Sequence, residues 1–170
     1  GTDVLLAGVK DEPLAAAQAL FLFFANETAI DSTPYGAVLD SSVTGPRVYI
    51  LGVVANEEPN FLFSYNVTNL TETMKKKLNR ERLNVGRSTY TERIVAILKQ
   101  SRSSRVREAL VEQASKAKGE QCDEMQWIEV SEHALTLLSE MSEHHVVFVT
   151  EQQYQTQAPM IDNMKRDNYQ

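Results

Sequence analysis

The chain has almost no cysteine. Cys122 is the only one among 170 residues, so no disulfide can form within the chain. Proteins without disulfides are typical of reducing compartments, and we therefore expect an intracellular location, in the cytoplasm or the nucleus. The longest apolar run, residues 14–25, is shorter than the roughly 20 residues that a membrane-spanning helix needs. The sequence thus predicts no membrane contact.

Motifs for catalysis and ligand binding are also missing. The chain contains no G-x-G-x-x-G, G-K-[ST] or G-x-S-x-G pattern, which argues against a phosphate-binding loop and a nucleophilic serine. His133, His144 and His145 do not have the spacing of a zinc site, and adjacent residues of a strand point to opposite faces. Acids surround Cys122, and their charge raises the pKa of a thiol. We therefore predict no catalytic, cofactor-binding or metal-ligating residues, and we expect that the protein is not an enzyme.

Negative charge is scarce in one part of the chain. Residues 75 to 118, called here the basic segment, hold 13 of the 17 Lys and Arg residues and only four acids, a net +9. The remainder holds 19 acids and four bases, a net −15, and the whole chain is −6. Such a segregation of charge along the chain gives information about binding partners rather than about the fold. Only one aromatic residue, Tyr90, lies in the basic segment, so stacking of nucleic-acid bases is poorly supported.

Length and composition predict one globular domain. With 42% apolar and 24% charged residues, the chain is too hydrophobic for general disorder. We place a single α+β domain at residues 1–150. Residues 151–170 are polar and rich in Gln, and we expect a flexible C-terminal tail there.

The N-terminal half predicts a helix beside a sheet. Asp11 and Pro13 are typical of a helix start, and residues 14–25 contain a single polar residue, Gln18. A helix this apolar should be buried on most sides, and we expect the sheet to pack against it. Alternatively, it could bury one face against a partner. Short connections between the strands favour an antiparallel meander. The predicted strands are residues 4–9, 35–39, 47–54 and 61–67, in the last of which Phe61, Phe63 and Tyr65 should face the core.

Helices should dominate the second half. Two capping-box patterns, at residues 69–72 and 89–92, predict helix starts in the basic segment. Ile94, Ile97 and Leu98 form an apolar stripe, which resumes after a polar break at residues 100–104. A strand at 125–130, a helix at 132–141 and a strand at 146–150 would form a C-terminal β-α-β element.

The basic segment supplies the candidate binding residues. We predict that these are Lys75, Lys76, Lys77, Arg80, Arg82, Arg87, Arg102, Arg105 and Arg107. Our first hypothesis is a non-catalytic protein-binding or assembly subunit of an intracellular complex. It would contact an acidic protein partner, or a second copy of this chain, through these residues.

Three alternatives remain open. The same basic helices would suit a nucleic-acid-binding accessory protein. The basic surface would have no external partner if the protein's own acids neutralised it. Finally, Asp31, Asp40, Glu57 and Glu58 fall near predicted strand ends, and an enzyme would result if such acids converged in three dimensions.

Overall fold

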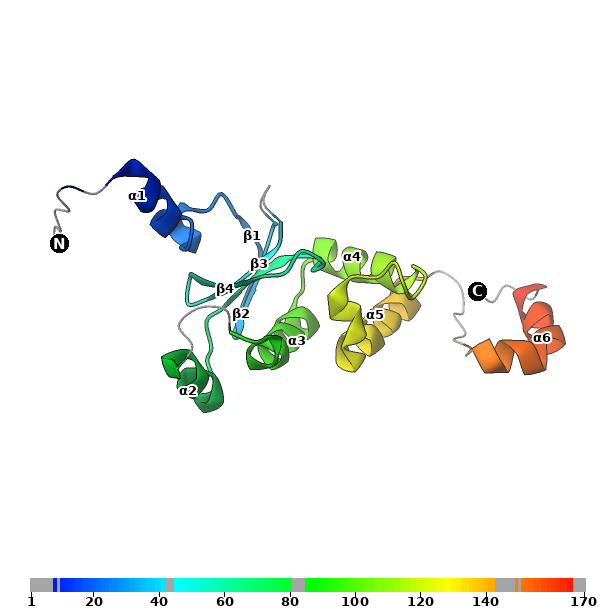
Figure 1. Cartoon of the computed structure of the whole chain (residues 1–170). Helices are drawn as coiled ribbons and strands as arrows, with labels where there is room; N and C mark the ends of the chain where they lie inside the picture. The colour runs from blue at the N-terminus through cyan, green and yellow to red at the C-terminus, as the bar shows by residue number, and fades with distance from the viewer. Residues whose placement is uncertain are drawn as a thin grey trace.

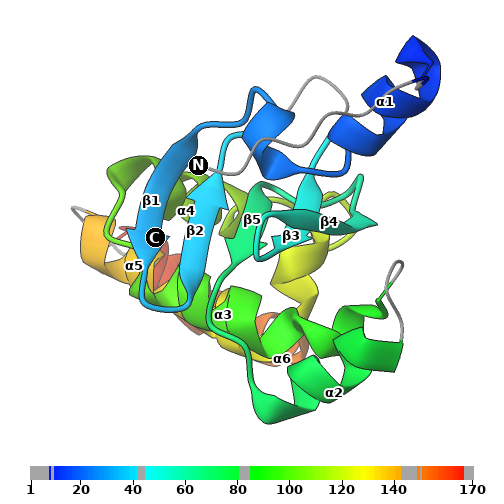
Figure 2. The same ribbon diagram turned by 90° about the vertical axis from the view of Figure 1, so that its left-hand side faces the viewer.

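A computed structural model describes residues 8, 10–41, 45–80, 85–142, 149 and 151–166. Its centre is one five-stranded sheet (Figure 1), in the order β1-β2-β5-β3-β4 (Figure 2). Neighbouring strands are antiparallel except β3 and β5, which are parallel. The predicted α+β class is confirmed, but β5 lies between β2 and β3, so the sheet is not a simple meander. The strands are β1 (Ala29–Thr33), β2 (Gly36–Leu39), β3 (Arg47–Ile50), β4 (Val53–Glu57) and β5 (Ser64–Val67).

The predicted strand at residues 47–54 is in fact two strands. A two-residue turn at Leu51 and Gly52 divides it into β3 and β4, and both residues have positive φ angles, 51° and 79°. Leucine rarely adopts this conformation, so the apolar run gives no sign of a turn. The turn is held by its neighbour β5: Leu51 N–H donates to the carbonyl of Val67 at 2.9 Å, and Gly52 N–H donates to Asn66 Oδ1 at 3.0 Å.

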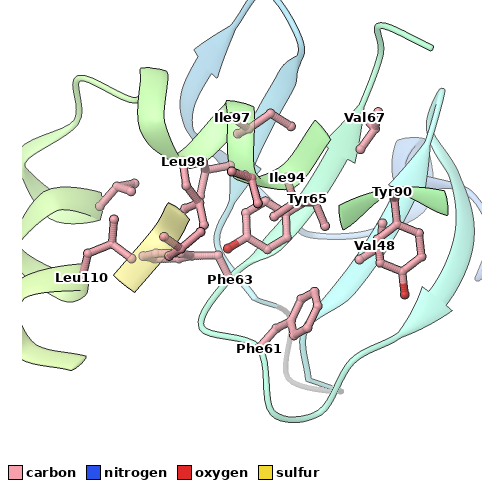
Figure 3. Packing of buried hydrophobic residues seen from close by; sticks show 14 of the residues in the cluster. Val48, Phe61, Phe63, Tyr65, Val67, Tyr90, Ile94, Ile97, Leu98 and Leu110 are labelled. Atoms are coloured by element: carbon pink, nitrogen blue, oxygen red, sulfur yellow. The ribbon is translucent and has the colours of Figure 1, made fainter. Parts of the chain in front are cut away.

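Helix α3 (Thr91–Gln100) covers one face of the sheet (Figures 1 and 3). Ile94, Ile97 and Leu98 are buried, as the apolar stripe predicts. They belong to one core cluster with the aromatic side chains of residues 61, 63 and 65, which confirms the predicted core face of that segment.

The N-terminal helix does not pack in the core. Helix α1 (Asp11–Gln18) has no buried residue, so the prediction of a buried apolar helix is wrong. The chain leaves the helix after Gln18 and passes through a short 3₁₀ helix, η1 (Leu22–Phe24). Its contact with the sheet is backbone pairing at β4: Val54 N–H donates to the carbonyl of Leu20, and Leu22 N–H to that of Gly52, each at 2.8 Å.

The rest of the described chain is helical. Helices α4 and α5 pack against each other, and Val106, Leu110, Val130 and Leu137 extend the core. The predicted strand at 125–130 is wrong, because Val130, with Ala134 and Leu137, continues a helical period back to the start of α5. The elements are α2 (Glu72–Arg80), η2 (Arg87–Thr89), α4 (Ser104–Ala114), η3 (Asp123–Gln126), α5 (Ile128–Met141) and α6 (Glu151–Arg166).

Several predictions concern the ends of the chain. The predicted strands at 4–9 and 146–150 lie almost entirely outside the described residues. In the predicted tail, residues 151–166 form helix α6, and the proposed boundary at residue 150 stays a prediction. No helix in the part of the chain that the structure describes is long and apolar enough to cross a membrane.

Candidate functional site

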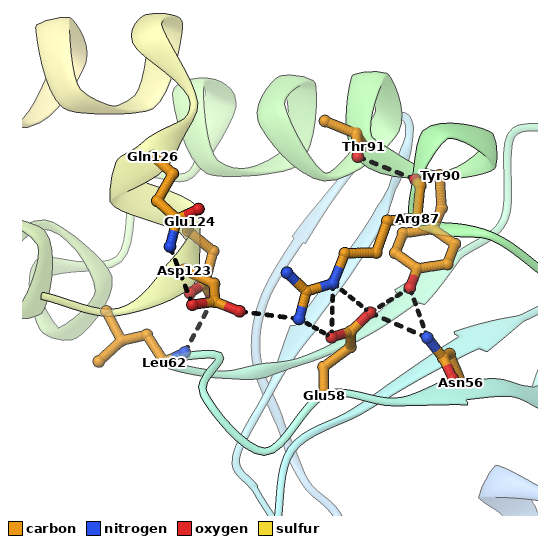
Figure 4. Close-up of polar contacts among 9 residues, drawn as sticks. All are labelled: Asn56, Glu58, Leu62, Arg87, Tyr90, Thr91, Asp123, Glu124 and Gln126. Atoms are coloured by element: carbon orange, nitrogen blue, oxygen red, sulfur yellow. Dashed lines mark hydrogen bonds and ion pairs between the residues drawn. The ribbon is translucent and has the colours of Figure 1, made fainter.

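A buried ion-pair network joins three separate parts of the fold (Figure 4). Glu58, which is 1% exposed, follows β4 and accepts two hydrogen bonds from Arg87 Nε, at 2.9 and 2.8 Å. Arg87 Nη2 bonds the same carboxylate and also Asp123, at 2.7 Å from its Oδ2. Tyr90 donates its hydroxyl to Glu58, and Asn56 Nδ2 donates to both, at 3.0 Å each. The network ties the loop after β4 to η2, α3 and η3.

The acids of this network are fully engaged. Burial raises the pKa of Tyr90, and the hydrogen bond to Glu58 adds to the rise. The hydrogen bond from Arg87 to Glu58 raises the pKa of the guanidinium, which Asp123 reinforces. A carboxylate with this many donors has its charge balanced inside the protein. The arrangement therefore supports a structural role for these residues.

A second buried acid lies close by. Glu124 Oε1 accepts hydrogen bonds from Leu62 N–H and the Tyr65 hydroxyl, both at 2.8 Å. Burial raises the pKa of Glu124. Burial, and then the charge of Glu124, raise the pKa of Cys122 to about 12. The thiol therefore stays protonated near neutral pH.

The other acids singled out from the sequence do not converge. Asp31 Oδ2 accepts hydrogen bonds from Ser101 Oγ at 2.6 Å and from the N–H groups of Arg102 and Ser103 at 2.7 and 3.0 Å. These bonds, the Ser101 hydroxyl first, lower the pKa of Asp31. Asp40 pairs with Arg105, and Glu57 pairs with Arg47. Each acid serves a local contact.

Two pockets lie beside residues that make these structural contacts. One, of about 570 Å³, lies beside Cys122 and Asp123, and another, of about 540 Å³, lies beside Asp31. Among the described residues no group of three or more His, Cys, Asp or Glu is placed to hold a metal ion. His144 and His145 lie outside those residues.

In the structure the predicted binding residues fall into three groups: those that form ion pairs, those that are not described, and those without an ion pair. Four of them pair with acids of the same chain: Lys75 with Glu72, Arg87 with Glu58 and Asp123, Arg105 with Asp40, and Arg107 with Glu140. The side chain of Arg80 and the whole of Arg82 lie outside what the structure describes. Lys76, Lys77 and Arg102 have no ion pair within the described chain. Lys77 donates only a long bond, 3.4 Å, to Ser88.

Two lysines without an ion pair within the described chain, Lys76 and Lys77, lie next to each other on helix α2. The helix begins after Thr71, whose Oγ1 accepts from Met74 N–H at 3.1 Å. Met74 is buried and anchors the helix to the core, while Lys76 is exposed and Lys77 half-buried. We call the part of α2 that carries Lys75, Lys76 and Lys77 the lysine face of α2; Lys75 pairs there with Glu72, whereas Lys76 and Lys77 have no ion pair within the described chain.

An apolar surface that the sequence analysis did not single out lies next to α1. The side chains of Leu20, Phe21, Phe23, Phe24 and Leu51 are all exposed; we call them the N-terminal apolar patch. Phe23 is 88% exposed and Leu51 60%. Their two segments are joined at the start of β4, where Phe21 pairs with Val53. Phe23 and Phe24 contact edge to face with ring centres 5.1 Å apart. The only sign of this surface in the sequence is the length of the apolar run. The run extends to residue 25, whereas helix α1 ends at Gln18.

Fold and site together define an α+β domain with a structural polar network, a lysine face and an exposed apolar patch. The chain belongs to the family described as the Mycoplasma pneumoniae MPN635 N-terminal domain, whose model matches residues 12–104. That match contains α1, the sheet, α2 and α3 and ends where α4 begins. Helices α4 and α5, which complete the core, therefore lie outside it.

Two proteins of Mycoplasma pneumoniae (strain ATCC 29342 / M129 / Subtype 1) resemble the chain, and both are described as uncharacterized. One is 31% identical over 102 residues, which are 59% of this chain and 41% of that protein. The other is 29% identical over 107 residues, 62% of this chain and 30% of that protein. The match thus spans less than half the length of either relative. No solved structure matches.

Proposed function

We propose that the chain is a non-catalytic protein-binding or assembly module of an intracellular complex. It binds its partner through the N-terminal apolar patch together with the lysine face of α2. The observation that carries this proposal is the patch itself. Proteins rarely expose clustered large apolar side chains without a function, and such clusters mark interaction sites. Phenylalanine at 88% exposure contributes nothing to the domain's own core.

Leu51 strengthens the argument. It stands in a left-handed conformation that favours Gly, Asn or Asp and costs leucine about 1 kcal/mol or more. Its side chain is nevertheless exposed beside the phenylalanines, where it gains no burial. A residue that is unfavourable for both conformation and solvation is best accounted for by a contact with another molecule.

The alternatives have less support. Five basic side chains of the basic segment, from Lys75 to Lys116, form ion pairs with acids of the chain, which reduces the positive surface available to nucleic acid. The acids that converge do so around Arg87, which forms ion pairs with both of them. Neither a phosphate-binding surface nor a catalytic pair is favoured.

Site-specific cross-linking tests the proposal. p-Benzoylphenylalanine replaces Phe23 in the full chain, expressed in its native cells, and adducts formed on irradiation are identified by mass spectrometry. The matched control carries the same group in place of Thr136, an exposed residue of α5. We expect one defined protein adduct from position 23 and none from position 136. Equal or diffuse labelling from both positions would contradict a binding role for the patch.

A further inference from the structure

We infer that the pocket beside Cys122 and Asp123, called here the η3 pocket, binds an extended peptide segment through the amide groups of its backbone. The pocket has a volume of about 570 Å³, within the range of about 300–1,000 Å³ that is usual for ligand sites. One wall is the loop between β4 and β5, residues 59–62, and the other is the end of α4 with the segment that leads into η3. The lining shares no residue with the N-terminal apolar patch or the lysine face of α2, so the inference goes beyond the proposed function.

A buried side-chain amide is held in place at this pocket. Gln113 of α4 lines the pocket and is only 6% exposed. Its Oε1 accepts a hydrogen bond from Cys122 N–H at 2.9 Å, which fixes which end of the amide is nitrogen. In the part of the chain that the structure describes, Nε2 donates to no residue. A buried donor without an acceptor is unfavourable, and an oxygen atom of a ligand in the pocket would satisfy it.

An amide acceptor lies beside this donor. The Nε2 of Gln121 donates to the backbone carbonyls of Gln113 and Lys116, at 3.1 and 3.3 Å. Its Oε1 accepts no hydrogen bond within the described residues, and Gln121 also lines the pocket. Asn60 adds an exposed amide from the opposite wall. A side-chain amide carries the same donor and acceptor groups as a peptide bond, so these residues can pair with peptide C=O and N–H groups.

The lining favours a peptide over a nucleotide. Bases bind by stacking on aromatic rings, but Phe61, the one aromatic among the described lining residues, is 5% exposed and belongs to the core. Lys118 lines the pocket together with Glu120 and Asp123, so the lining does not select a phosphate by its charge. A peptide needs neither an open ring nor a cationic site, because hydrogen bonds to its main chain supply affinity.

An NMR titration of the full chain tests the inference. The probe is N-acetylated, C-amidated tetra-alanine, which presents peptide groups and only methyl side chains. We expect saturable shifts of the side-chain amide signals of Gln113 and Gln121 and of the backbone N–H of Cys122. Adenosine at the same concentrations should leave these signals unchanged.

Three variants locate the contact. Gln113→Glu keeps an oxygen that accepts from Cys122 N–H but removes the donor, so the probe should bind about tenfold more weakly, the loss of one hydrogen bond. Asn60→Ala changes an exposed residue of the other wall and should also weaken binding, by about threefold or more. Gln100→Ala, the matched control, removes an exposed amide outside this pocket and should leave the affinity unchanged. Thermal unfolding checks each fold, and Asn60→Ala decides the test if Gln113→Glu proves unstable.

Three results would overturn the inference. The absence of a saturable shift at Gln113 would mean that water alone satisfies its donor. Equal shifts with adenosine would exclude selection of peptide groups, and unchanged affinity in Asn60→Ala would place the probe elsewhere. The cross-link from position 23 reports on a different surface, so failure here leaves the proposed function standing.

Discussion

Glu58 and Arg87 form a two-point ion pair that joins the loop after β4 to the 3₁₀ helix before α3. The carboxylate is buried and the guanidinium half-exposed, so the acid depends on the arginine for its charge balance. Arg87 therefore holds the fold together, although its place in the basic segment suggested a partner contact.

Replacing Arg87 with Ala should destabilise the domain severely. The change leaves Glu58 buried without its countercharge, which typically costs about 3–5 kcal/mol. Urea unfolding followed by circular dichroism measures the loss. Arg105→Ala is the matched control, because its pair with Asp40 is exposed and should contribute less than about 1 kcal/mol. Equal losses in both variants would contradict the structural role of Arg87.

Asp31 should stabilise the junction between α3 and α4 in a pH-dependent way. Its hydrogen bonds lower its pKa, so the folded state favours the ionised form. The stabilisation is fully present above the unfolded pKa of about 3.9 and is lost as the pH falls through the lower folded pKa. Asp31→Asn should lower the free energy of unfolding by about 2 kcal/mol near neutral pH. The variant should also lose less of its stability than the wild type as the pH falls, which flattens the acid limb of the plot of stability against pH. An unchanged acid limb in that variant, or an equal cost for Asp40→Asn, would refute the assignment.

Gly36 of β2 pairs with Val67 of β5 and has no room for a side chain. A Cβ atom there would lie 2.1 Å from the carbonyl oxygen of Asn66 and 3.0 Å from Ile97 Cδ1. Because the first contact is with backbone, Gly36→Ala should destabilise by about 3 kcal/mol, the upper end of overpacking effects. Thermal unfolding provides the measurement. Gly86→Ala has open space around its Cβ and should be nearly neutral, so similar midpoints for the two variants would count against this packing.

Cys122 should resist thiol reagents in the folded protein. Its pKa of about 12 keeps the thiol protonated, mainly because it is buried. Near neutral pH, native protein should react with iodoacetamide roughly a thousandfold more slowly than urea-unfolded protein, whose thiol has a pKa near 8.5. The native rate should continue to rise with pH beyond the point where the unfolded rate levels off. A native rate that levels off with the unfolded one would show an ordinary thiol.

The sequence predicted best those elements whose pattern is set locally. The stripe of Ile94, Ile97 and Leu98 has the period of a helix with one buried face, and α3 has that face in the core. Phe61, Phe63 and Tyr65 alternate as a core-facing segment should, and all three are buried. In both places burial and local geometry favour the same structure.

Predictions failed where contacts between residues far apart in the sequence determine the local structure. The turn at Leu51 is set by hydrogen bonds that Leu51 and Gly52 donate to β5, and the apolar residues around it resemble a continuous strand. The apolar run after Asp11 predicts burial, yet part of it remains exposed in α1 and the patch. Glu58 and Arg87 are 29 residues apart, so no local pattern could pair them. An exposed apolar patch resembles core in any sequence, because the partner that would cover it is not part of the pattern.

Hydroxyl-radical footprinting of the wild-type chain tests most directly whether the patch is a binding surface. Oxidation of Phe21, Phe23, Phe24 and Leu51 is compared between dilute purified protein and the assembled protein in native extract. The account predicts strong oxidation in the dilute protein and protection of several-fold in the assembly. Ile128, an apolar residue of α5 that is 70% exposed, should be oxidised equally in both. Equal oxidation of the patch in the two conditions would contradict the account.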